Sequence, residues 1–154
     1  MTEKIKKWRF AFVLAAALSL SSMLWLTWHP VEIVAVHHDG NFSYALVNHF
    51  PVTDRGKINW WLKNREKIKL TYNIPQPASS GSFNITFWRF GEGYKKRDKY
   101  DRLCFDDMQE KENCIEKEPL FTVRRFGHKD ILFITYEGRY KLQANGEIVK
   151  VPKD

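Results

Sequence analysis

The chain has 154 residues and a formal net charge of +7, from 25 lysine and arginine residues against 18 aspartate and glutamate residues. An apolar N-terminal segment takes up about 30 residues, and the remaining ~125 suit one domain with one core, which excludes a second domain of ordinary size. Because four of the cations lie in the first nine residues, the excess of positive charge is not by itself a sign of nucleic-acid binding.

The N-terminal segment predicts a membrane anchor. An uncharged stretch runs from Phe10 to Trp28 and spans roughly 28 Å as a helix, close to the hydrocarbon thickness of a bilayer. We therefore predict a cytoplasmic tail over residues 1–9 and a transmembrane helix over residues 10–28. Trp25 and Trp28 are expected at the membrane interface, because indole rings favour the headgroup level. The tail is basic, with Lys4, Lys6, Lys7 and Arg9.

A cleaved secretory signal is the alternative to an anchor. Residues 15–17 and 19–21 offer the small side chains that signal peptidase prefers. The chain turns apolar again at residues 23–26, after these small residues, and this favours an uncleaved anchor.

Charge and cysteine content predict where the rest of the chain lies. Basic residues beside a first span tend to stay in the cytoplasm, so residues 30–154 are expected on the periplasmic side of a bacterial inner membrane. That topology separates the domain from the genome and argues against a nucleic-acid partner. Cys104 and Cys114 suit an oxidising compartment, and we predict a disulfide between them. Two unpaired thiols are the alternative, whereas a metal site lacks further ligands at the usual spacing.

The first part of the domain predicts a hairpin and a helix. Residues 31–36 and 42–50 read as strands that turn at Asp39-Gly40. Thr53 or Asp54 can cap a helix that runs to Tyr72, with apolar residues at helical spacing on one side.

The second part predicts mainly strands. Residues 83–88 alternate as a strand with two apolar faces, and the charged segment that follows is expected to be a loop with a short helix at residues 106–111. A meander then closes the chain, with strands at residues 120–125, 131–136, 139–142 and 147–151. The predicted fold class is α+β, with a largely antiparallel sheet and one main helix.

Catalytic signatures are missing from the sequence. It contains no phosphate-binding loop, nucleophile elbow or zinc-protease helix, and no cofactor is expected. His37 and His38 are adjacent in a predicted strand, so their side chains should point to opposite faces. His49 could approach one of them across the hairpin. A hydrolase that uses these three histidines is therefore a weak hypothesis.

Two charged segments are candidate binding surfaces. Trp60 and Trp61 lie about 100° apart around the helix, so Trp61 is expected to face the core and Trp60 to be exposed beside Lys57 and Lys63. An exposed tryptophan among cations suits a protein partner or the lipid headgroup zone. The second segment is acidic, and its candidate partner-binding residues are Asp106, Asp107 and Glu110. A single charge change in this acidic segment is expected to be tolerated.

Several motifs together resemble an enterobacterial family of uncharacterised membrane proteins, domain-of-unknown-function family 943. The resemblance covers nearly the whole chain and is carried by residues 30–36 with Asp39-Gly40, residues 50–62, residues 87–94, residues 99–105 and residues 113–117. It implies a single N-terminal span, a small exported domain and no catalytic residues.

The resemblance also suggests a function, because members of the family occur in clusters beside toxin or secretion loci. We therefore expect a non-enzymatic, membrane-anchored binding protein, with neutralisation of a delivered toxin as the leading hypothesis. Its partners would be membrane lipid and a protein. The alternative is an accessory subunit of an inner-membrane complex.

Overall fold

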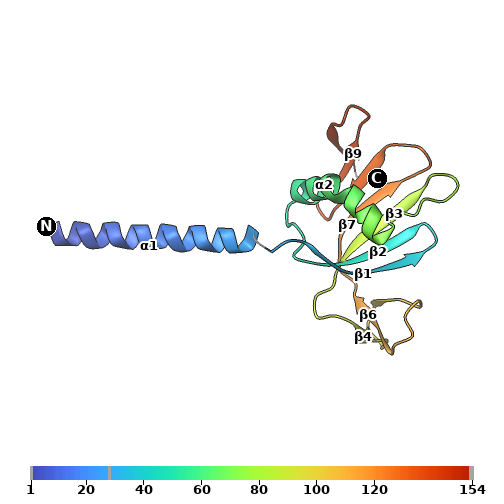
Figure 1. Ribbon diagram of the computed structural model, residues 1–154, viewed down its shortest axis with the longest axis horizontal. Helices are drawn as coiled ribbons and strands as arrows, with labels where there is room; N and C mark the ends of the chain where they lie inside the picture. The colour runs from blue at the N-terminus through green and yellow to red at the C-terminus, as the bar shows by residue number, and fades with distance from the viewer. Residues whose placement is uncertain (1, 28, 153–154) are drawn as a thin grey trace. The chain divides into compact units, whose positions relative to one another are not determined.

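The computed structural model describes residues 2–27 and 29–152 (Figure 1). The chain divides into two compact units between Pro30 and Val31, and each unit is described by itself.

The first unit is the helix α1 (Thr2–Thr27). It begins earlier than predicted and takes in the basic tail, whose glutamate and lysine residues favour helix. Residues Thr2–Leu24 form a helix that is long and apolar enough, by length and composition, to cross a membrane. Of the two predicted interface residues, Trp28 lies outside the described residues, as does the side chain of Trp25.

Serine hydroxyls within α1 are satisfied by the helix backbone. Ser19 Oγ donates to the Ala15 carbonyl oxygen at 2.7 Å, and Ser21 and Ser22 make the same kind of bond three residues back. Such bonds lower the cost of placing a hydroxyl in apolar surroundings.

The second unit is built on a seven-stranded sheet with the order β1-β2-β3-β7-β8-β9-β10. All neighbouring strands are antiparallel except β2 and β3, which are parallel. The α+β fold class predicted from the sequence is therefore confirmed. The strands are β1 (Glu32–Asp39), β2 (Phe42–Asn48), β3 (Phe83–Arg89), β7 (Pro119–Arg125), β8 (Ile131–Ile134), β9 (Arg139–Leu142) and β10 (Ile148–Val151).

The helix α2 (Asp54–Tyr72) connects the two parallel strands and covers one face of the sheet. Thr53, one of the two predicted capping residues, is its N-cap, and the Thr53 side chain accepts a hydrogen bond from the Gly56 amide at 3.0 Å. Asn73 ends the helix in the left-handed conformation, with its amide bonded to the Lys69 carbonyl.

A row of aromatic rings fills the core between α2 and the sheet. Phe87, Phe121 and Phe133 come from three neighbouring strands, and their ring centroids lie 5.9 and 5.8 Å apart. Phe50 extends the row, 5.3 Å from Phe87. Because alternate residues of β2 and β3 face this side, Leu46 and Trp88 are left to face the other.

That other face is partly covered by a small sheet with the order β4-β6-β5. Its strands are β4 (Lys95–Lys96), β5 (Arg102–Cys104) and β6 (Glu112–Glu116). The short helix predicted at residues 106–111 is wrong: the chain makes a turn at Asp106 and Asp107 and then returns as β6. This segment has no row of apolar residues with which a helix could pack, whereas pairing of β5 with β6 satisfies the backbone directly.

Candidate functional site

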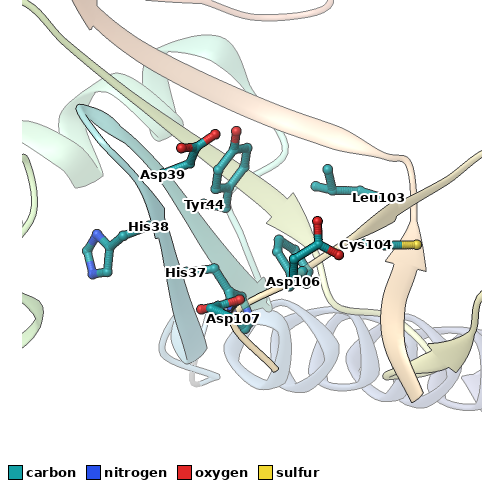
Figure 2. Close-up of a pocket in the computed structure, with 9 residues that line it drawn as sticks. His37, His38, Asp39, Tyr44, Leu103, Cys104, Asp106 and Asp107 are labelled. Atoms are coloured by element: carbon teal, nitrogen blue, oxygen red, sulfur yellow. Dashed lines mark hydrogen bonds and ion pairs between the residues drawn. The ribbon is translucent and has the colours of Figure 1, made fainter. Parts of the chain in front are cut away.

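A cavity of about 300 Å³ opens where the β1–β2 hairpin meets the small sheet (Figure 2). Three carboxylates and two aromatic side chains, from segments far apart in the sequence, line this cavity. Its lining residues are His37, His38, Asp39, Tyr44, Leu103, Cys104, Phe105, Asp106 and Asp107.

His37 lies under this cavity, on the side of β1 that faces the small sheet, and is only 6% exposed. Its ring stacks on Phe105 with the centroids 3.8 Å apart. Both ring nitrogens have partners: Nδ1 lies 2.8 Å from Asp107 Oδ2, and Nε2 lies 2.8 Å from the Tyr94 hydroxyl. His37 therefore joins the main sheet to the residue before β4 and to the turn between β5 and β6.

The electrostatics of Tyr94 define its role in this contact. Burial raises the pKa of the Tyr94 hydroxyl, and the negative charges of Asp107 and Glu110 raise it further. The hydroxyl thus keeps its proton and can donate it to Nε2, while Nδ1–H donates to Asp107. A histidine oriented by a carboxylate is also found in catalytic triads, but there Nε2 faces a nucleophile. Here Nε2 is occupied by Tyr94, and the arrangement suits a structural connection.

The rim of the cavity is acidic. Asp39 lies at the turn of the hairpin, and burial followed by the charge of Asp39 raises the pKa of Tyr44 beside it. Asp106 is exposed and makes an ion pair with Arg97, which is exposed as well, at 2.8 Å. An exposed pair of this kind exchanges readily with other partners because it contributes little free energy. The rim therefore suits a cationic group.

The disulfide fixes one wall of the cavity. Cys104 and Cys114 are bonded and face each other across β5 and β6, as predicted. Phe105 follows directly and is held by a hydrogen bond from its amide to the Asn113 carbonyl at 2.9 Å. The bridge thus sets the position of the turn that carries Asp106 and Asp107.

Ion pairs hold the outer side of the small sheet. Arg102 bonds to Asp98 and to Glu116, and Lys95 bonds to Glu92 and to Glu116. Hydrogen bonds from Lys95 and Arg102 lower the pKa of Glu116. The charged side chains of this segment therefore form a connected network.

The residues predicted to bind a partner fall on two different faces. Asp106 and Asp107 line the cavity, and Glu110 lies close enough to influence Tyr94. Lys57, Trp60 and Lys63 lie on α2, which covers the opposite face of the sheet.

Two expectations for the helix are wrong. Trp60 is not an exposed side chain: its ring meets Phe50 at 5.0 Å and Phe87 at 5.5 Å. Trp61 also contacts Phe87, at 6.1 Å, so neighbouring tryptophans share the core. The row of phenylalanine rings is wide enough to receive both. Lys57 is buried as well, so of the two lysines predicted beside Trp60 Lys63 is exposed and Lys57 is not.

The histidine cluster considered from sequence does not assemble. Figure 2 shows His38 pointing away from His37 on the other side of β1, as strand geometry predicts. The expected approach of His49 is wrong, because His37 pairs with Tyr44 whereas His49 follows the far end of β2, beyond Asn48. Within residues 2–27 and 29–152, no group of three or more histidine, cysteine, aspartate or glutamate side chains could hold a metal ion.

Sequence reasoning missed Tyr94 and Phe105 as parts of the site. Each comes from the segment around the small sheet and meets His37 only in the folded domain. The high aromatic content of the sequence was the signal that could have pointed to these residues, but it does not show which rings contact each other.

A larger hollow of about 810 Å³ lies between α2 and the β9–β10 hairpin. Asp54 anchors it by accepting hydrogen bonds from Thr135 Oγ1 at 2.8 Å and from the Tyr140 hydroxyl at 2.7 Å. The bond to Asp54 raises the pKa of Tyr140 to about 12. Its walls carry both signs of charge, with Arg55, Glu147 and Lys150 among the lining residues.

Comparison with known proteins gives one match. The family described as "Enterobacterial putative membrane protein (DUF943)" matches residues 2–152. No curated protein and no solved structure matches the chain.

Proposed function

Because the chain belongs to the DUF943 family of enterobacterial putative membrane proteins, we propose that it is a membrane-anchored, non-enzymatic binding protein. Its exported domain receives a basic group of a protein partner in the acidic cavity beside His37.

The acidic rim is the observation that carries this proposal. Asp39 and Asp106 line the cavity from two different sheets, and Asp106 is paired with Arg97, which is exposed as well. His37 has both nitrogens occupied and supports the wall. A rigid cavity with exposed carboxylates favours binding of a lysine or arginine side chain, because complementary charge supplies specificity and speeds association.

The anchor and its orientation are part of the proposal. Helix α1 is apolar enough to span a membrane, and its first residues carry the cations that favour the cytoplasmic side. The Cys104–Cys114 disulfide supports an oxidising compartment for the domain. We therefore place the protein in the bacterial inner membrane, with the domain in the periplasm.

Neutralisation of a toxin delivered to the periplasm or inner membrane is the specific role proposed for this binding. It draws on the resemblance to a family found beside toxin loci, and on the acidic cavity, which would complement a basic surface of such a toxin. Binding alone would suffice for protection, so no catalytic group is needed.

An accessory role in an inner-membrane complex is the second candidate. Its support is α1, which carries exposed large apolar residues such as Trp8, Phe10 and Phe12 that could pack against other spans. Replacing α1 with an unrelated anchor separates the two roles, since toxin neutralisation should survive the exchange and assembly through the span should not.

The test is charge reversal at the rim. Asp39→Lys and Asp106→Lys should each abolish recovery of the partner that crosslinks to the unchanged protein in membranes of its host, and, where that partner is a toxin, should abolish protection of a host strain against it. Glu66→Lys is the matched control, because Glu66 is an exposed acid on α2, on the opposite face of the sheet. Full protection by both rim variants would reject the cavity as the binding site.

A further inference from the structure

The chain enters the main sheet from α1 at one end of the strands, which we call the entry end. Glu32 begins β1 and pairs with Asn48, so β2 finishes at this end. The strand directions of β3, β7 and β8 make β8 run toward this end, and its last residue, Ile134, pairs with Thr122 in the middle of β7. The loop at residues 49–53 therefore leaves β2 at this end, and the turn at residues 135–138 continues from β8 toward it.

The two connections carry strongly exposed apolar and aromatic residues. Val52 is 90% exposed and Tyr136 is 93% exposed. The hydrogen bond of Asp54 to Thr135 ties the connections together, since Val52 precedes Asp54 by two residues and Tyr136 follows Thr135. This end of the sheet thus presents Val52 and Tyr136 as a pair of projecting side chains.

Covalent geometry keeps this end near the membrane. Four Cα steps lead from Thr27, the last residue of α1, to Val31, and even a fully extended chain covers only about 14 Å in that length. If α1 spans a bilayer, its last turns reach the headgroup layer, and the chain then enters the domain within about 14 Å of the end of that helix.

We propose that this end of the domain contacts the lipid headgroup layer, with Val52 and Tyr136 inserted into it. The proposal rests on the membrane anchor of the proposed function. Tyrosine favours this zone because its ring is apolar and its hydroxyl is polar. Arg55, in the first turn of α2, follows the loop that carries Val52 and can meet lipid phosphates. The contact fixes the height at which the acidic cavity stands above the membrane.

The test uses the full chain in vesicles of phosphatidylethanolamine and phosphatidylglycerol. Photoreactive p-benzoylphenylalanine replaces one residue at a time, and mass spectrometry identifies what each position crosslinks. Val52 and Tyr136 are the test positions. Leu70 and Phe126 are matched controls, because they are 87% and 57% exposed but lie toward the other end of the domain, near the end of α2 and just after β7. Leu14 in α1 reports on the anchor.

The expected result is lipid adducts at positions 14, 52 and 136 and none at 70 and 126. Lipid adducts at position 14 without any at 52 and 136 would reject the contact while keeping the anchor. Equal lipid adducts at the two control positions, or protein adducts at 52 and 136 from a second copy or another partner, would also overturn it. No adduct at position 14 would reject the anchor and the contact together.

Discussion

Asp107 and His37 meet across 70 residues of sequence, with Asp107 Oδ2 lying 2.8 Å from His37 Nδ1. The histidine is buried while the carboxylate is about half exposed, so the contact lies at the border between core and solvent. Through it the turn after β5 is fastened to β1, and the wall of the cavity is fixed to the main sheet.

Asp107→Ala should lower the free energy of unfolding by about 1–2 kcal/mol, because a buried ring nitrogen loses its partner. Urea denaturation followed by tryptophan fluorescence measures the change. Asp106→Ala is the control and should stay within about 0.5 kcal/mol, since its ion pair is exposed. Equal stability of the two variants would mean that the contact with His37 contributes nothing.

Ionisation of the Tyr140 hydroxyl should lower the free energy of unfolding at alkaline pH. Its pKa is raised to about 12 by the bond to Asp54, so the folded protein holds the phenolic proton at pH values where the unfolded chain has lost it. The contribution to stability is complete below pH ~10, the ordinary tyrosine pKa, and is lost as pH rises toward 12. Tyr140→Phe should show a shallower decline across this window in denaturation at a series of pH values.

An absorbance titration of the tyrosines provides the control for that result. The native protein should show a late ionisation that Tyr140→Phe lacks. If the two proteins titrated identically, the raised pKa would belong to another residue.

The disulfide should be complete in protein isolated from its host. Thiol labelling of the denatured, unreduced protein should find no free thiol, because both cysteines of the chain are bonded to each other. Replacing Cys104 and Cys114 together by serine should cost roughly 2.5 to 3 kcal/mol, as loop-closure entropy predicts for a loop of this size. Two free thiols would instead indicate a reducing compartment and contradict the proposed periplasmic location.

Trp60→Ala should destabilise the domain by about 2–3 kcal/mol, because the ring packs against Phe50 and Phe87. Trp61→Ala, at a buried position, should cost about 3–5 kcal/mol. Chemical denaturation measures both, with Tyr136→Ala as an exposed aromatic control that should change stability little. If Trp60→Ala left the free energy of unfolding unchanged, Trp60 would be a surface residue after all.

Elements defined by local pattern were predictable from the sequence. The hairpin of β1 and β2, the helix from Thr53 to Tyr72 with its cap, and the meander from β7 to β10 each follow from turn residues, capping residues and alternation within a short segment. Their boundaries agree with the structure to within one or two residues at most ends.

The pairings between these elements were not predictable in the same way. The parallel contact of β2 with β3 depends on how α2 packs, and the small sheet depends on two- to five-residue strands in a charged segment. The contacts of His37 with Tyr94 and Asp107 come from this long-range arrangement. The prediction for Trp60 failed because helical geometry gives the direction of a side chain but not the width of the surface below it.

The position of β3 within the sheet also affects how the domain folds during synthesis. β1, β2, α2 and β3 leave the ribosome before β7, so β3 has a partner on one side only until Pro119–Arg125 arrives. During that interval an apolar strand that contains Phe83, Ile85 and Phe87 has an open edge, which is a template for wrong pairing with other chains. Chains that stop short of β7 should therefore aggregate, and the C-terminal meander acts as the part of the protein that closes this edge.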